Sequence, residues 1–526
     1  QLYRGCQQNK SGAGVTWALP FLFFLKRRAN YACYAVQTVQ SPYDRGVPST
    51  EMETIRSHWR DSAGWKAAGL PLTTTSDEAC KLYDAAITQY VGWYDDPALG
   101  GLSATVSKIR QADPDFVMGQ VLETGLTLIG TGESVSTSEV LRKDVARLAA
   151  IAKEGCPSRR ERLHVDAVLA WSRGRMSRAA ALWEDILIDD PTDILALKLA
   201  HDSYFYLGRQ RQMRDSVARV LPRWKKSTPL YSYLHGMLAF GLCETNLYDR
   251  ARQSAELALQ MNRNDAWATH AMAHVYEMQA DPDGGIAFMS RTLGDWEPCG
   301  MLACHNFWHW AVFHVEKGER EAALDLFDGQ MIRRLVSSGA MLDYVDASSL
   351  LYRLQLGADV KEDLKSRWPC VWNAAKPHLN DRILVFNQLH FLMACLGVGA
   401  STDQLLAMPT SDVSGKVEDD GWPADQQLAA SQVGLPVMKA MVAHSEGRFG
   451  DAAEQLAAVR YDVLRIGGSD AQRDVFDLLL LDSAMRSDRH NHLAEALLAE
   501  RSIARPKSPM LQTMAETFSR RRGPAS

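Results

Sequence analysis

Hydrophobic residues recur at helical spacing along most of the chain after residue 75. In the stretch 78–94, apolar residues fall three or four positions apart and therefore share one helix face: Leu82, Ala86, Tyr90 and Trp93. The preceding Thr75-Ser-Asp-Glu78 has the pattern of a capping box, which typically begins a helix. Strand-like alternation bounded by Asn-Gly or Asp-Gly turns is nearly absent. The pattern predicts an all-α fold.

A short turn recurs along the middle of the chain at intervals of 34, 38, 35 and 37 residues. Its positions are Gly174, Gly208, Asn246, Asp281 and Gly318. Five positions after each turn comes a residue suited to close helix packing, and in three of the five units it is Ala. A helix–turn–helix unit with a period near 34 is typical of tetratricopeptide repeats. We therefore predict a tetratricopeptide-like helical-hairpin solenoid, a right-handed superhelix of antiparallel helix pairs.

The same pattern divides the chain into four segments. Residues 1–51, with the apolar run 17–25 and three basic residues after it, look foreign to the rest. We expect an appended or disordered leader there, with Met52 as the start of the folded protein. Residues 52–400 are expected to form the N-terminal and central repeats. Residues 401–424 are rich in Ser, Asp, Gly and Pro and predict a loop or hinge, and 425–526 predict C-terminal repeats and a tail.

The amino-acid composition argues against two classes of binding partner, nucleic acid and membrane. The 526 residues carry a formal net charge of −5, so no general basic field favours nucleic acid. The apolar run near the N-terminus has nine residues, too few to span a bilayer, so we expect no membrane partner. Nine cysteines without a Cys-x-x-Cys pair indicate reduced thiols and a cytoplasmic protein.

Several longer strings resemble one known family. They are WKAAGLPLTTTSDEACKLYDA, FVMGQVLETGLTLIGTG, AHDSYFYLG, QMRDSVARVLP, MLACHNFWHWA and GGSDAQRDVF. Together they are similar to the tetratricopeptide repeat protein 38 family, over roughly Trp65 to Pro509. The resemblance implies a helical repeat fold. It implies no activity and no catalytic residue.

Histidines concentrate in one part of the predicted solenoid. Eight of the fourteen lie between His164 and His314, and all eight fall in expected first helices of the repeats. Because first helices line the concave side of such a superhelix, we expect a groove lined by histidine and aromatic side chains. The candidate groove residues are His201, His235, His270, His274, Glu277, His305, His309 and Trp308.

The chain has two pairs of histidines, and within each pair the two residues are four positions apart. The two rings of each pair therefore share one helix face. Imidazoles and a carboxylate on such faces suit Zn²⁺ or another divalent transition metal. The candidate ligands are His270, His274, Glu277, His305 and His309. No His-Glu-x-x-His motif is present. Two alternatives stay open, namely groove histidines bonded to neighbouring carbonyls and acids, and acid–base catalysis without a metal.

Two functions follow as hypotheses. The first is a binding module that holds an unknown peptide, protein or small molecule in the concave groove. The second is an enzyme that uses the histidine cluster, as a metal-dependent hydrolase or lyase. Nothing in the sequence requires a cofactor, and whether the two histidine pairs meet depends on a helix register that the sequence does not specify.

Overall fold

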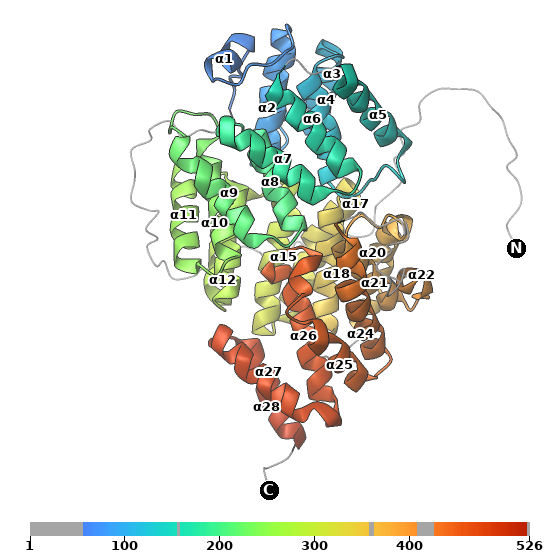
Figure 1. The fold of residues 1–526 in the computed structure, drawn as a ribbon. Helices are drawn as coiled ribbons and strands as arrows, with labels where there is room; N and C mark the ends of the chain where they lie inside the picture. The colour runs from blue at the N-terminus through green and yellow to red at the C-terminus, as the bar shows by residue number, and fades with distance from the viewer. Residues whose placement is uncertain (1–55, 155–157, 357–361, 408–424, 523–526) are drawn as a thin grey trace, which may run out of the picture. The chain divides into compact units, whose positions relative to one another are not determined.

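The computed structural model describes residues 56–154, 158–356, 362–407 and 425–522 (Figure 1). Within these ranges every regular element is a helix, so the all-α prediction is confirmed there. The described residues all belong to one compact unit. The expected leader, 1–51, and residues 408–424 of the expected loop lie outside the described residues.

Five helices precede the regular repeats. They are α1 (Ser62–Ala67), α2 (Asp77–Gly92), α3 (Gly101–Ala112), α4 (Val117–Ile129) and α5 (Glu139–Glu154). Ser76 caps α2, because its side chain accepts a hydrogen bond from the backbone N–H of Ala79 at 3.1 Å. The sequence pattern had pointed to Thr75 as this cap, one residue too early.

Helical hairpins follow, as expected of a tetratricopeptide-like solenoid. The consecutive pairs are α6 (Arg159–Ser172) with α7 (Met176–Asp189), α8 (Ile194–Tyr206) with α9 (Gln210–Val220), α10 (Tyr231–Cys243) with α11 (Tyr248–Met261), α12 (Ala266–Met278) with α13 (Pro282–Arg291), and α15 (Gly300–Lys317) with α16 (Arg320–Leu326). A left-handed residue stands in each turn: Gly174, Gly208, Asn246, Ala280 and Gly318. Four of these are the predicted positions. In the fourth turn Asp281 instead caps α13.

The later helices are less regular in length. They are α14 (Leu293–Trp296), α17 (Ile332–Ser338), α18 (Met341–Gln355), α19 (Glu362–Lys365), α20 (Trp368–Ala375), α21 (Val385–Val398), α22 (Asp403–Leu406), α23 (Gln427–Ala429), α24 (Leu435–Ser445), α25 (Phe449–Val459), α26 (Asp470–Arg486), α27 (Asn491–Ala504) and α28 (Pro509–Arg522). Another hairpin, α24–α25, also has a left-handed glycine in its turn, Gly447. A capping box formed by Ser469 and Gln472 begins α26.

The first helices of successive units pack side by side. Helix α10 contacts α12, α12 contacts α15, α15 contacts α18, and α18 contacts α21. Helix α26 then returns to pack against both α12 and α18, and α28 packs against α15 (Figure 1). The C-terminal helices therefore cover the helix faces on which the sequence had predicted an open groove.

Two glycines allow this return of the chain. Gly208 has φ +63°, and a Cβ there would lie 1.9 Å from the carbonyl oxygen of Leu464. Gly467 has φ +86°, and its Cβ would lie 2.5 Å from the carbonyl oxygen of Tyr206. Only a residue without a side chain fits between two backbones at this distance. These contacts join the α8–α9 turn to the segment that leads into α26.

We expect Gly208→Ala to destabilise the protein more than Gly318→Ala does. Both sites are left-handed, which costs an alanine roughly 1–2 kcal/mol, but a Cβ at Gly318 has nothing within 4 Å. The additional clash at Gly208 should add about 1–3 kcal/mol. Urea unfolding of the two variants measures the difference. Equal free energies of unfolding for the two variants would show that the α8–α9 turn accommodates the added Cβ without loss of stability.

Candidate metal centre

Helices α12 and α15 carry the centre. His270 and His274 lie on α12, and His305 and His309 lie on α15. Residues four apart on a helix lie one turn apart on the same face. Because α12 and α15 pack against each other as first helices of adjacent units, the two pairs face one another.

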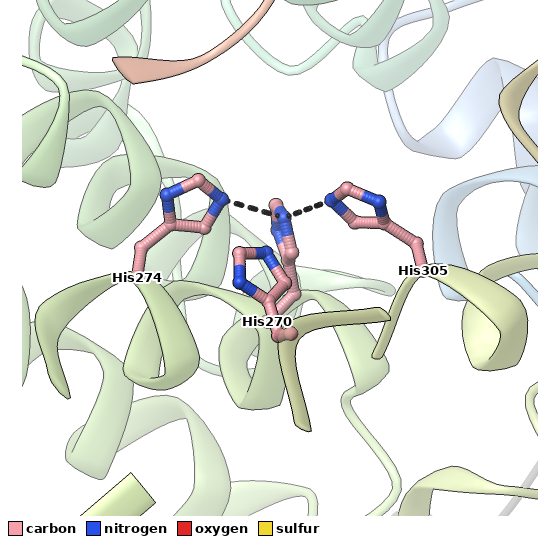
Figure 2. A group of neighbouring side chains, drawn as sticks. His270, His274 and His305 are labelled. Carbon is pink, nitrogen blue, oxygen red and sulfur yellow. Dashed lines mark hydrogen bonds between the residues drawn. The ribbon is translucent and has the colours of Figure 1, made fainter. Parts of the chain in front are cut away.

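The four rings meet around one point. One ring nitrogen from each histidine lies within 4.8 Å of the other three. Nε2 of His270 is 2.9 Å from Nε2 of His274 and 3.0 Å from Nε2 of His305, as Figure 2 shows. The ring centroids of His274 and His309 are 4.5 Å apart. All four side chains are buried.

Carboxylates bond the outer nitrogens of two rings, and a third carboxylate lies near another ring. Nδ1 of His305 donates to Asp346 at 2.8 Å, and Nδ1 of His309 donates to Glu277 at 2.8 Å. Nδ1 of His274 lies 3.7 Å from a carboxylate oxygen of Glu244. A neutral ring that donates through Nδ1 carries a lone pair on Nε2. At least two rings therefore direct bare lone pairs at the shared point.

The environment favours the neutral form of His270, His274 and His309. Burial, with repulsion from the neighbouring rings, lowers the pKa of His270 and of His274 well below the ordinary value. Burial and the nearby His305 do the same to the pKa of His309. The Nε2 atom of His309 is buried and has no hydrogen-bond partner among the described residues. Neutral imidazole with an unshared lone pair is the form that binds a metal ion.

Two of the nitrogen–nitrogen distances are close to those around one tetrahedral ion, and all four nitrogens lie within 4.8 Å of one another. Zn²⁺ binds imidazole nitrogen at about 2.0–2.1 Å, which places neighbouring ligand nitrogens about 3.3 Å apart. The two close nitrogen pairs, at 2.9 and 3.0 Å, are slightly nearer than that. A proton on His270 Nε2 satisfies only one of its two neighbours at a time, whereas an ion at the shared point satisfies all four lone pairs. These residues therefore fit a transition metal.

Glu277 occupies a different position from the four rings. Its Oε2 atom faces Nδ1 of His309, on the far side of that ring from the shared point. Its Oε1 atom is buried without a partner among the described residues. Burial raises its pKa. The carboxylate orients a ring in the way that outer partners of metal ligands commonly do.

The other candidate residues lie around the cluster. Trp308 is fully buried and stacks on His305, with ring centroids 5.3 Å apart and an interplanar angle of 8°. His201 lies within 3.3 Å of the carbonyl oxygen of Met237 and packs edge-on against Trp267. His235 packs against Tyr231 instead. Neither His201 nor His235 belongs to the group of converging nitrogens.

Helix α26 closes the centre from outside. The backbone N–H of Asp470 donates to both carboxylate oxygens of Glu244, at 3.2 and 3.0 Å. The Arg473 guanidinium lies 3.6 Å from the same carboxylate. Burial and the Asp470 carboxylate raise the pKa of Glu244 well above its usual range. The expected groove histidines are consequently buried rather than exposed on a concave surface, because a distant helix packs over them.

Sequence reasoning missed Glu244 and Asp346. Each is a carboxylate beside a histidine of the cluster, yet each comes from a neighbouring unit of the chain. Asp346 lies in a stretch of α18 where every residue from Asp343 to Leu354 is buried, and a buried acid normally has a hydrogen-bond partner. That is the signal which points to it. Glu244 follows the last residue of α10, where a carboxylate looks like ordinary surface.

No protein-family model matches the chain. Among solved structures it is similar to a human IFIT1 dimer with m7Gppp-AAAA, with 11% sequence identity and a TM-score of 0.33. The similarity covers 86% of this chain and 92% of that chain. A likeness this remote carries no inference about what the present chain binds. None of the described helices combines the length and the apolar character needed to cross a membrane.

Proposed function

We propose that this chain is a metal-binding helical repeat protein that holds one divalent transition ion, such as Zn²⁺. The ligands are His270, His274, His305 and His309. One observation carries the proposal: ring nitrogens from all four lie within 4.8 Å of one another in a buried place. The carboxylates on the outer nitrogens of His305 and His309 support it, since metal-ligating histidines usually donate to such a partner.

Glu277 serves in this proposal as the partner that orients His309, not as a ligand. Four imidazoles complete a tetrahedral ion, as in structural zinc sites, whereas catalytic zinc keeps a position open. An ion whose four coordination positions are all filled by histidine favours metal binding alone over the alternative of a hydrolase or lyase. Because α26 packs over the first helices, the predicted groove has no open face for an extended peptide. The ligand proposed for it is therefore a small molecule.

We also propose that the chain is a member of the tetratricopeptide repeat protein 38 family, on the strings quoted above. A cytoplasmic location is supported by the cysteines, since the described ones are all free: Cys80, Cys243, Cys299, Cys304, Cys370 and Cys395.

Elemental analysis tests the metal proposal. We expect about one equivalent of a first-row transition metal per chain after expression in metal-supplemented medium and desalting at pH 7.5. The affinity for the ion should fall little between pH 7.5 and pH 6.0, because the pKa values of His270, His274 and His309 are lowered and protons compete little for these three rings. An exposed four-histidine site, with ordinary pKa values near 6.5, would lose its ion in that interval. Less than a tenth of an equivalent at pH 7.5 would contradict the proposal.

A further inference from the structure

A cavity of about 240 Å³ lies among α15, α16, α18, α26 and α28, away from the four histidines. At ~30 Å³ for each water molecule, it has room for about eight small groups. Most of its wall is apolar: Val315, Leu354, Leu356, Leu478, Met510 and Met514. Its polar side chains are Arg320, Arg353 and Asp482.

Arg353 is the polar group that links this cavity to the candidate metal centre. Its side chain is 2% exposed, and its guanidinium lies 5.7 Å from the ring centroid of Trp308, which stacks on His305. One terminal nitrogen donates to the carbonyl oxygens of Ala471 and Gln472. The Nε–H group is buried and has no partner among the described residues. A buried, incompletely bonded guanidinium in a cavity wall is suited to an anion.

The acids near Arg353 do not fully neutralise it. Its ion-pair partner, Asp474, is 3.4 Å away and also accepts a two-pronged contact from Arg501, at 2.7 and 3.0 Å. Arg505 lies 3.2 Å from the same carboxylate. One carboxylate is therefore shared by three guanidinium groups.

The remaining acids in this region have other partners. Asp482, in the cavity wall, pairs with His444 at 2.7 Å and with Arg486 at 3.0 Å. Glu316 accepts a hydrogen bond from Ser508, and burial raises its pKa. Glu277 and Glu316 line a second, water-sized void that Arg353 also borders, and neither acid lines the large cavity. Arg353 is thus the incompletely neutralised cation in the wall of this cavity.

We propose that this cavity binds a small amphipathic carboxylate. The carboxylate group is held by Arg353, with Arg320 beside it, and the hydrocarbon chain packs against Leu354, Leu478 and Met514. An apolar wall with a few placed polar groups is the usual composition of a small-molecule site. No histidine lines this cavity, so the proposal stands apart from the metal ion.

Calorimetric titration of the full chain with octanoate tests the proposal. We expect saturable binding at one site, with octylammonium and octanol at least tenfold weaker, because neither carries a negative charge for Arg353. Arg353→Gln should weaken octanoate binding at least tenfold. Arg334→Gln is the matched control, since Arg334 also pairs with an acid and lies over an aromatic ring, but outside the cavity. That variant should bind octanoate as the wild type does.

A second variant keeps the test decisive if Arg353→Gln fails to fold. Met514→Trp places a larger side chain at a half-buried cavity position and should abolish octanoate binding. Absence of saturable binding, equal binding of octanoate and octanol, or unchanged affinity in Met514→Trp would each overturn the proposal. The titrations are run on metal-loaded and chelator-treated protein, and we expect the same octanoate affinity in both. If the protein binds no metal, the octanoate titration can therefore still be interpreted.

Discussion

Zinc should stabilise the wild-type chain against unfolding and should leave His270→Ala unchanged. An ion that binds only the folded state adds about 4 kcal/mol when its free concentration is a thousand times the dissociation constant. His270 is the best single position for the test, because its Nε2 atom is adjacent to those of both His274 and His305. Urea unfolding with buffered zinc and with chelator measures the effect.

His201→Ala is the matched control for that experiment. His201 is as buried as His270 and also lies in a first helix, but outside the converging group. Its loss should cost about 1–3 kcal/mol through the disturbed packing and the lost polar contact. The zinc-dependent gain in stability should nevertheless remain. A zinc effect that persists in His270→Ala, or that disappears equally in His201→Ala, would contradict the assignment of the ligands.

Asp474→Asn should destabilise the protein by about 3–5 kcal/mol, the usual cost of removing one partner from a buried ion pair. Asp474 is 6% exposed and contacts Arg353, Arg501 and Arg505. These arginines lie on α18 and at the end of α27, so the carboxylate on α26 joins three helices of the fold. Without its charge the three guanidinium groups stay buried and repel one another.

Asp451→Asn provides the comparison. Asp451 also contacts two arginines, Arg448 and Arg489, at 2.9 and 3.2 Å, but its side chain and theirs are exposed. Water and salt screen such pairs, so we expect no measurable change in the free energy of unfolding. If both substitutions have equally small effects, the region around Asp474 admits water more freely than its burial indicates.

Much of the fold follows from local sequence. The turns at Gly174, Gly208, Asn246 and Gly318 were recognisable because each needs a left-handed residue, which glycine and asparagine tolerate best. The fourth turn was misplaced by one residue, since Ala280 takes that conformation while Asp281 caps the next helix. Both residues suit a helix boundary, and only the backbone geometry separates them.

The candidate site, too, was predicted only in part from the sequence. The four-residue spacing of His270 with His274, and of His305 with His309, places each pair on one helix face, because the rotation per residue is a local property. Whether the pairs meet depends on how α12 and α15 are rotated against each other. That rotation is decided by the packing of their side chains, which involves residues from several units. The same packing brings Asp346 and Glu244 to the outer nitrogens.

The sequence by itself determined the helices, the repeat and the face of each helix that carries histidine, because these depend on neighbours within a few residues. Only the tertiary structure decided that the histidines converge and are buried. Helix α26 begins about 200 residues after His270, and its contact with Glu244 joins units that no local pattern connects. An interior closed by such a distant segment excludes water, and that exclusion lowers the pKa of His270, His274 and His309.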